Sequence, residues 1–319
     1  MTQQMQKNCN STLFLHFSCM KFAIATFLLA GLSCVRAEGE LAVASLSTVL
    51  SDVAKNVGGA KVTVAEIVKP GVDPHDFQPS PGDIKALSKA RVVLASGLGF
   101  ESYLEKLRAS VGSGPEFVIV GEKITPILVE EDDDHEGHDH SHGKGGKVPD
   151  PHWWHSIANV KIATRAVRDA FVAADPANQA VFEANAKAYL ARLDDLAKWT
   201  KIQVARLPKD RRVLVTSHDA LGYFARDYGF EIHPVEGIST SEQPSSKRVR
   251  ALIQEIKAEG VKAIFAENVE NPKVLGEITR ETGAVSGGTL YADGLGATEA
   301  NTYETMMRHN VETIVKGLE

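Results

Sequence analysis

The sequence predicts an α/β fold of two lobes, each with a parallel β-sheet flanked by helices, joined by one long rigid helix. Short β-rich runs alternate with helical stretches from 41 to 120, and the same alternation restarts at 212. Strands separated by helices of this length are typical of βαβ units, which form parallel sheets. Between the two blocks, 177–206 contains no Gly or Pro and has the length of a single long helix.

Each block supplies the elements of one lobe. In the first block we expect strands at 41–45, 61–67, 91–95 and 116–120, with helices at 48–57, 82–89 and 103–111. In the second block we expect strands at 213–216, 231–234 and 263–266, with helices at 220–228, 246–259, 272–282 and 302–318. The expected boundaries are an N-terminal lobe at 38–175, a connecting helix at 176–208 and a C-terminal lobe at 209–319.

The connecting segment opens after Pro176, and one helical stripe carries apolar residues at Leu190, Leu193, Ala197 and Val204. Thirty residues of α-helix have a length of about 45 Å. Such a helix could lie on the surface of one lobe. Its position between the two blocks favours a strut that joins both lobes.

A signal peptide is expected at 1–37. Met20-Lys21 precedes an apolar run at 22–32 and a small-residue cleavage site that ends at Ala37. The polar residues 1–19 lie upstream of this complete signal, and we interpret them as an extension of the start site. The apolar run is shorter than the roughly 20 residues of a membrane-spanning helix.

The cysteines and the net charge agree with export. All three cysteines (Cys9, Cys19 and Cys34) precede the cleavage site, so the mature chain would contain no thiol. Lipidation of Cys34 is an alternative, although the residues before it match a lipobox poorly. Cleavage would remove three basic residues and no acidic one, which lowers the net charge from −6 to −9. An acidic surface argues against nucleic acid as a partner.

One segment, at 130–147, has the composition of a metal-binding loop. Between 130 and 142 it interleaves seven carboxylates with four histidines, which are His135, His138, His140 and His142. Because 130–146 contains no apolar residue, we expect this segment to be disordered. Imidazole suits zinc, copper and nickel, so a low-affinity site that collects such an ion or senses its abundance is expected. Deletion of 130–146 without effect when the ion is scarce would remove this hypothesis.

A tight metal site needs ligands on a stable frame. Two further histidines lie where expected strands end, and one aspartate lies in a similar loop. His75 lies in a proline-bracketed loop after the strand at 61–67, and His218 follows the strand at 213–216. Asp293 lies in another loop of this kind. Ligands bind at the carboxyl ends of strands in open parallel sheets, so we expect these side chains to face the crevice between the lobes.

Four segments resemble motifs of the ZnuA/TroA family, the metal-binding receptors of zinc and manganese ABC importers. They are Val72-Asp-Pro-His-Asp-Phe-Gln-Pro-Ser-Pro81, Asp150-Pro-His-Trp-Trp154, Val215-Thr-Ser-His-Asp-Ala-Leu-Gly-Tyr-Phe224 and Tyr291-Ala-Asp-Gly-Leu295. The resemblance covers essentially all of the chain after the signal peptide. It implies a metal site made by His75 and His152 of the first lobe with His218 and Asp293 of the second.

This ligand set favours zinc. Three imidazoles and one carboxylate suit tetrahedral Zn²⁺ with bonds of about 2.0–2.2 Å, whereas Mn²⁺ favours more oxygen ligands. The family's manganese members tend to have Glu at the third position, where this sequence has His218. A manganese or iron receptor of the same family, or a surface adhesin on the same scaffold, is the alternative.

One residue departs from the family pattern. His155 stands where the family usually has an aliphatic or aromatic residue, three residues after His152, so one helical turn could bring both to one face. It could exchange roles with His152 or be a packed structural histidine. His233 and His309 lie outside the four motifs, and we interpret both as structural.

These observations predict a monomeric periplasmic receptor that delivers Zn²⁺ to the membrane permease and ATPase of an ABC importer. One ion bound by both lobes would close the crevice, while the long helix limits the hinge motion. The rival from another class is a secreted zinc hydrolase. Four protein ligands leave no position for a catalytic water, and no His-Glu-x-x-His segment occurs, so we expect no enzymatic activity.

Overall fold

The computed structural model describes residues 39–130, 146–240, 244–268 and 273–319. The predicted signal peptide at 1–37 and the four histidines of the predicted metal-binding loop therefore lie outside the described residues. Residues 40–319 form one compact unit. Among the described residues, no helix is both long enough and apolar enough to cross a membrane.

The first half of the chain contains β1 (Leu41–Ser45), α2 (Thr48–Gly58), β2 (Val62–Glu66), α3 (Pro81–Leu87), β3 (Val92–Ala95), α4 (Leu104–Val111) and β4 (Glu116–Ile119). The middle contains the short strands β5 (Leu128–Glu130) and β6 (Lys147–Pro149), then α5 (Ile157–Ala174) and α6 (Gln179–Val204). The second half contains β7 (Val213–Thr216), α7 (Gly222–Tyr228), β8 (Glu231–Pro234), α8 (Ser246–Glu259), β9 (Ala263–Glu267), α9 (Lys273–Thr282), β10 (Val285–Leu290) and α10 (Tyr303–Leu318).

Two four-stranded parallel sheets confirm the predicted fold class. Their strand orders are β2-β1-β3-β4 and β8-β7-β9-β10, so the two sheets share one topology. In each sheet the strand order reverses beside the first strand, between β1 and β3 and between β7 and β9. Such switch points bind ligands at the carboxyl ends of the strands.

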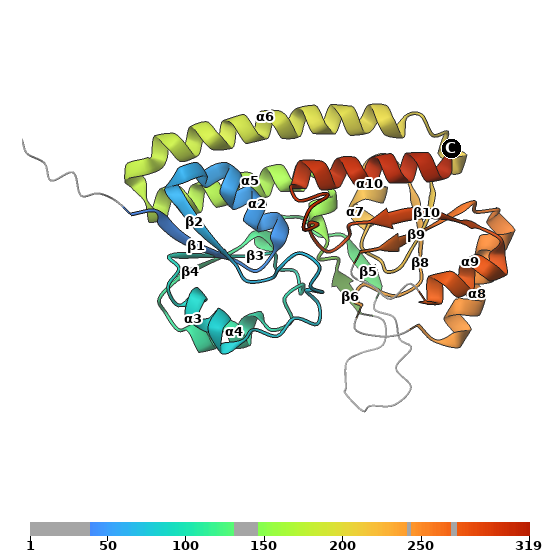
Figure 1. Ribbon diagram of the computed structural model, residues 1–319, viewed down its shortest axis with the longest axis horizontal. Helices are drawn as coiled ribbons and strands as arrows, with labels where there is room; N and C mark the ends of the chain where they lie inside the picture. Colours follow the sequence, from blue (N-terminus) through green and yellow to red (C-terminus); the bar gives the residue numbers. More distant parts are fainter. Residues whose placement is uncertain (1–38, 131–145, 241–243, 269–272) are drawn as a thin grey trace, which may run out of the picture. The chain divides into compact units, whose positions relative to one another are not determined.

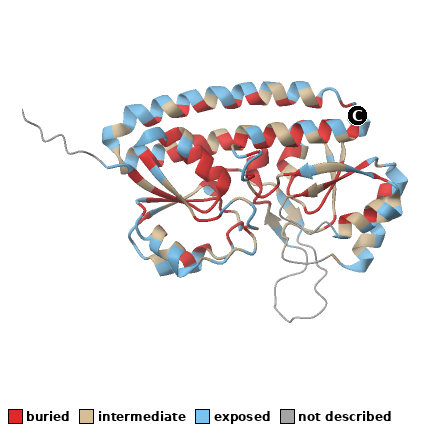
Figure 2. Cartoon of the chain, in the orientation of Figure 1, coloured by how far each residue is buried: buried red, intermediate tan, exposed pale blue. Residues whose placement is uncertain are grey.

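Helices α2, α5, α6 and α10 pack together as a layer that crosses both sheets (Figure 1). The apolar core under this layer is continuous, because one cluster of buried side chains includes Val53 of α2, Leu193 of α6 and Met307 of α10. Smaller clusters lie under α3 and α4 and under α8 and α9. Figure 2 shows the buried residues concentrated along the sheets and on the inner faces of the helices that form the layer.

The predicted connecting helix is confirmed as the single helix α6. It has 26 residues and a length of about 39 Å, and it lies within the expected bounds of 176–208, two residues inside each end of the segment 177–206 that lacks Gly and Pro. It contacts α2 of the first half, α5 directly before it in the chain, and α10 of the second half. The two sheets are therefore joined by a helix that packs against elements of both halves.

Strand β10 is a difference from the prediction, because no strand was expected at 285–290. Its register against β9 shifts between Ser286 and Gly288. A Cβ at Gly287 would lie 2.4 Å from the ring of Phe265 on β9, so only glycine packs there. Two successive glycines remove the β-rich pattern from the sequence although the strand forms.

Candidate metal centre

The structure brings the four predicted ligands together. His75 lies in the loop between β2 and α3, His152 between β6 and α5, His218 after β7 and Asp293 after β10. One ligand atom from each side chain lies within 4.8 Å of the ligand atoms of the other three. The side chains are 0–6% exposed, so the group is almost fully enclosed.

Five of the six separations among the four ligand atoms match the edges of a tetrahedron. The Nε2 atom of His152 is 3.4 Å from that of His75 and 3.4 Å from that of His218. Oδ1 of Asp293 lies 3.6, 3.3 and 3.3 Å from the Nε2 atoms of His75, His152 and His218. A tetrahedral ion with bonds of about 2.0–2.2 Å has edges of about 3.3–3.6 Å. A single ion at the centre would therefore contact all four atoms at bonding distance.

Two carboxylates set the ring orientation of two of these histidines. Nδ1 of His152 donates to Oδ1 of Asp150 over 2.9 Å, and Nδ1 of His218 donates to Oε2 of Glu267 over 2.5 Å. A carboxylate only accepts, so the proton of each neutral ring belongs on Nδ1 and the lone pair on Nε2. That lone pair points to the centre of the group. This carboxylate–histidine arrangement recurs at metal sites in proteins.

The register of the second sheet explains the partner of His218. Val215 of β7 pairs with Ile264 of β9 in a parallel ladder, so the positions three residues further on, His218 and Glu267, also lie side by side. The backbone N–H of His218 donates to the same carboxylate over 3.2 Å. Two contacts to one carboxylate therefore fix both the backbone and the ring.

The carboxylate of Asp293 is the negative centre of the group. Both of its oxygens are buried without a hydrogen bond, and the nearest nitrogens are the imidazole atoms 3.3–3.6 Å away. Burial alone would raise the pKa of Asp293, but the imidazoles of His218 and His152 hold it well below its ordinary value. A buried carboxylate without hydrogen bonds is costly, and a bound cation would remove that cost.

Neighbouring carboxylates raise the pKa of two of the imidazoles, those of His152 and His218. Burial lowers the pKa of His218, but the charges of Asp293 and Glu267 outweigh burial and raise it well above its ordinary value. The pKa of His152 is also raised, because Asp150 and Asp293 outweigh burial. Without a metal ion, the site therefore attracts protons, which a metal ion must displace.

The loop that carries His75 is fixed at its base. The backbone N–H of His75 donates to Oδ1 of Asp73 over 2.8 Å, and Oδ2 of Asp73 accepts from the hydroxyl of Thr240 over 2.8 Å. Thr240 belongs to the second half of the chain, so this carboxylate links the two halves. The ring of His75 stacks edge-on against Phe100, which follows β3.

His155 holds the backbone beside Asp293 and is not part of the tetrahedral group. Its Nε2 donates to the carbonyl of Ala292 over 2.8 Å, and Nε1 of Trp154 donates to the same carbonyl over 2.8 Å. Burial, followed by the charge of His152, lowers the pKa of His155 to about 4. The structure thus places His152, and not His155, with the other three ligands.

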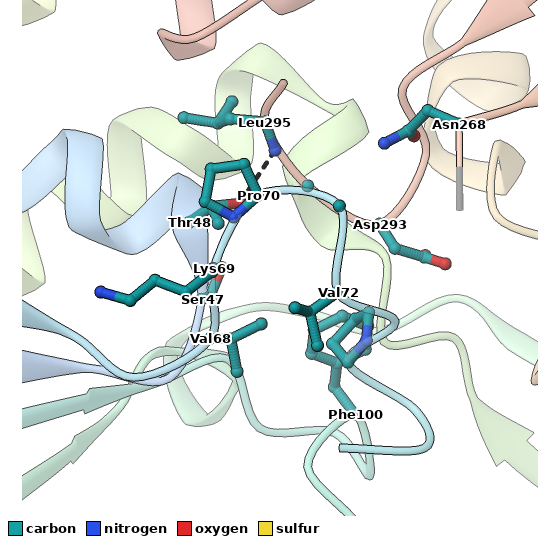
Figure 3. Close-up of a pocket in the computed structure, with 13 residues that line it drawn as sticks. Ser47, Thr48, Val68, Lys69, Pro70, Val72, Phe100, Asn268, Asp293 and Leu295 are labelled. Atoms are coloured by element: carbon teal, nitrogen blue, oxygen red, sulfur yellow. Dashed lines mark hydrogen bonds between the residues drawn. The ribbon is translucent and has the colours of Figure 1, made fainter. Parts of the chain in front are cut away.

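A pocket reaches Asp293 from one side of the group (Figure 3). Its walls come from the loop that follows β2, including Val68 and Pro70, and from the loop after β10. Phe100 and Asn268 also line it, and the N–H of Leu295 donates to the hydroxyl of Thr48 across it. The metal centre is therefore enclosed by loops from both halves of the chain.

The remaining predicted residues lie elsewhere. Nε2 of His309 contacts the carbonyl of Thr289 at 2.9 Å, in agreement with a structural role. His233 lies among three glutamates on the second lobe. Sequence reasoning did not assign roles to Asp150 or Glu267. The available signal was position: Asp150 lies two residues before His152, and Glu267 lies directly after the strand predicted at 263–266.

Two parallel-sheet lobes, a long helix packed on both and a buried group of three imidazoles and one carboxylate define a class of bilobal metal-binding receptors. The comparisons with known proteins agree. The chain belongs to the family described as zinc-uptake complex component A, periplasmic, whose model matches residues 43–317. The chain is therefore a periplasmic metal-binding receptor of an ABC transporter, and its relatives include substrate-binding proteins of such transporters.

Three relatives illustrate the range of the family. The manganese-binding lipoprotein MntA of Bacillus subtilis is 34% identical over 305 residues, which cover 92% of this chain and 96% of MntA. The iron-binding protein YfeA of Yersinia pestis is 32% identical over 272 residues, 85% of this chain and 84% of YfeA. Among solved structures, the periplasmic zinc-binding protein TroA of Treponema pallidum superposes on this chain with a TM-score of 0.78 and 28% sequence identity. The match covers 88% of this chain and 99% of TroA.

Proposed function

We propose that this receptor binds one Zn²⁺ through His75, His152, His218 and Asp293 and delivers it to the permease and ATPase of a zinc ABC importer. The observation that carries the proposal is that five of the six separations among the four ligand atoms are 3.3–3.6 Å. Three neutral imidazoles and one carboxylate form a closed tetrahedral shell for Zn²⁺. A closed shell suits capture and transport and leaves no position for a catalytic water.

Manganese is the second candidate, because MntA, a relative with 34% identity, is named as manganese-binding. The donor set supports zinc instead. Mn²⁺ favours a larger shell with more oxygen ligands, whereas this group offers three nitrogens and the single carboxylate of Asp293. The Irving–Williams order also places zinc above manganese for a nitrogen-rich site.

Contacts between the halves support a receptor that closes around its ion. Two ligands come from each lobe, so one ion would bind both. Two hydrogen bonds also cross between the lobes close to the ligands. Thr240 donates to Asp73, and the backbone N–H of Leu295 donates to Thr48. We propose that loss of the ion loosens these contacts and that the permease recognises the difference in lobe position.

Export and attachment are part of the proposal. The expected cleavage after Ala37 would release a soluble, monomeric receptor into the periplasm. The alternative is a lipid anchor on Cys34, and it has support from relatives such as MntA that are named lipoproteins. Mass measurement of the mature chain from membrane and periplasmic fractions distinguishes a free N-terminus at 38 from a lipidated Cys34.

A competition experiment tests the metal assignment. The metal-free protein is titrated with zinc in the presence of a chelator of known affinity, and then with manganese against bound zinc. We expect one tight zinc ion per chain, displaced by manganese only in large excess. In the His75→Ala, His218→Ala double variant, two of four ligands are absent and the tight zinc ion should be lost. Displacement of zinc by equimolar manganese would favour the manganese receptor, and unchanged tight binding by the double variant would refute the site.

A further inference from the structure

A second group of metal-ligating side chains lies on the C-terminal lobe and shares no residue with the interlobe site. Glu231 and His233 are two residues apart on β8, the edge strand of the second sheet, so their side chains project from the same face. Glu255 and Glu259 are four residues apart on α8, so they lie on one face of that helix. The strand and the helix therefore present one imidazole and three carboxylates to one another.

The imidazole of His233 is the centre of this group. Its Nε2 lies 2.9 Å from Oε2 of Glu259 and 3.6 Å from Oε1 of Glu231. Its Nδ1 lies 3.7 Å from Oε2 of Glu255. The ring is only 14% exposed, whereas the three carboxylates are 38–67% exposed. Only the glutamates can therefore move freely, and the imidazole is a fixed ligand.

The buried ring nitrogen has no hydrogen bond. Nε2 of His233 makes none, although Oε2 of Glu259 lies 2.9 Å away. A buried polar atom without a hydrogen bond is costly and requires an explanation. A cation between this nitrogen and the two carboxylates would provide one, because it would contact all three groups at once.

We propose that Nε2 of His233, Oε1 of Glu231 and Oε2 of Glu259 bind a second divalent cation. These three ligand atoms lie within 4.8 Å of one another. One imidazole and two carboxylates form a donor set for borderline divalent ions such as zinc, with water in the remaining positions. Glu255 beside Nδ1 would keep the ring proton on that nitrogen and leave Nε2 free for the metal.

This second site should bind zinc more weakly than the interlobe site. It has three protein ligands instead of four, and its glutamate side chains must lose conformational freedom when they bind. Its exposed carboxylates keep the ion in contact with water. Occupancy is therefore expected only after the interlobe group has filled.

Nitrogen-15 NMR of the histidine side chains in the full-length chain tests the proposal, with zinc alone as the probe. The signals of His233 are identified as those absent from the His233→Gln variant. We expect Nε2 of His233 to move to the range of metal-bound imidazole nitrogen as zinc exceeds the first equivalent. Glu259→Gln should weaken this response at least about tenfold. His309→Gln, which changes a histidine outside both groups, should leave it unaltered.

Two results would overturn the second site. One is a His233 signal that stays unchanged up to millimolar zinc, and the other is an unaltered response in Glu259→Gln. Circular dichroism of each variant excludes loss of folding as the cause. The signals of His75, His152 and His218 report the interlobe site in the same spectra, so the two proposals fail or succeed independently.

Discussion

Glu267 is not one of the four candidate ligands, yet its contacts with His218 should matter for affinity. It accepts from both the backbone N–H and Nδ1 of His218. The negative charge of Glu267 orients the ring of His218 and increases the basicity of that ring. Glu267→Gln removes this charge. We expect zinc affinity to fall by about 10–100-fold. Isothermal titration in competition with a chelator measures the change, and Glu312→Gln, an exposed glutamate on α10, is the matched control. Equal affinities of the two variants would show that Glu267 has no part in binding.

Proton competition gives a second prediction for single side chains. The pKa of His218 is raised well above its ordinary value, because Asp293 and Glu267 outweigh burial. Below that pKa, zinc must displace a proton from His218, so the zinc affinity falls as the pH falls. Because this pKa is raised, the zinc affinity should still be increasing with pH at pH 7. Each displaced proton changes the affinity by up to about tenfold per pH unit. Dissociation constants at pH 6, 7 and 8, corrected for buffer and chelator protonation, measure this slope. A constant affinity over that interval would contradict imidazole ligation.

The four candidate ligands could be predicted from the sequence, but their supporting carboxylates could not. His75, His218 and Asp293 follow expected strands or lie in similar loops, and the sequence motifs identify them. The partner of His218 depends on the pairing of Val215 with Ile264, which aligns β7 with β9. Register of this kind arises from packing between segments far apart in the chain and has no local signal.

The helix α6 connects the two sheets through its buried face, which gives a prediction about stability. Leu193 is fully buried in the core shared by both halves, whereas Ile202 of the same helix is 66% exposed. Leu193→Ala should lower the free energy of unfolding by about 2–5 kcal/mol, because it leaves a cavity. Ile202→Ala should change it by less than about 0.5 kcal/mol. Urea unfolding of the metal-free variants measures both, and losses of similar size would contradict the described packing of α6.

Element prediction succeeded where hydrophobic patterns were local. β7, β8 and α8 have the bounds expected from the sequence. β10 was missed because its central glycines conceal the strand, and β5 and β6 are only three residues long. Helix α5 was also not predicted, although its buried residues Val160, Val167 and Phe171 recur at helical spacing.

Both lobes and the layer of helices across them converge on one group of four side chains. Each half contributes a sheet of the same strand order and two of the four ligands. The continuous core beneath α2, α6 and α10 limits how far the halves can separate. We therefore expect the metal-free and metal-bound receptors to differ by a small movement between the lobes, with each lobe unchanged internally.

Anomalous X-ray diffraction from crystals grown with one equivalent of zinc would decide whether the ion lies where the geometry indicates. We predict one strong peak at the zinc absorption edge, about 2.0–2.2 Å from Nε2 of His75, His152 and His218 and from an oxygen of Asp293. A peak elsewhere with these four side chains directed apart, or an organic solute between the lobes in place of the ion, would contradict the proposed site.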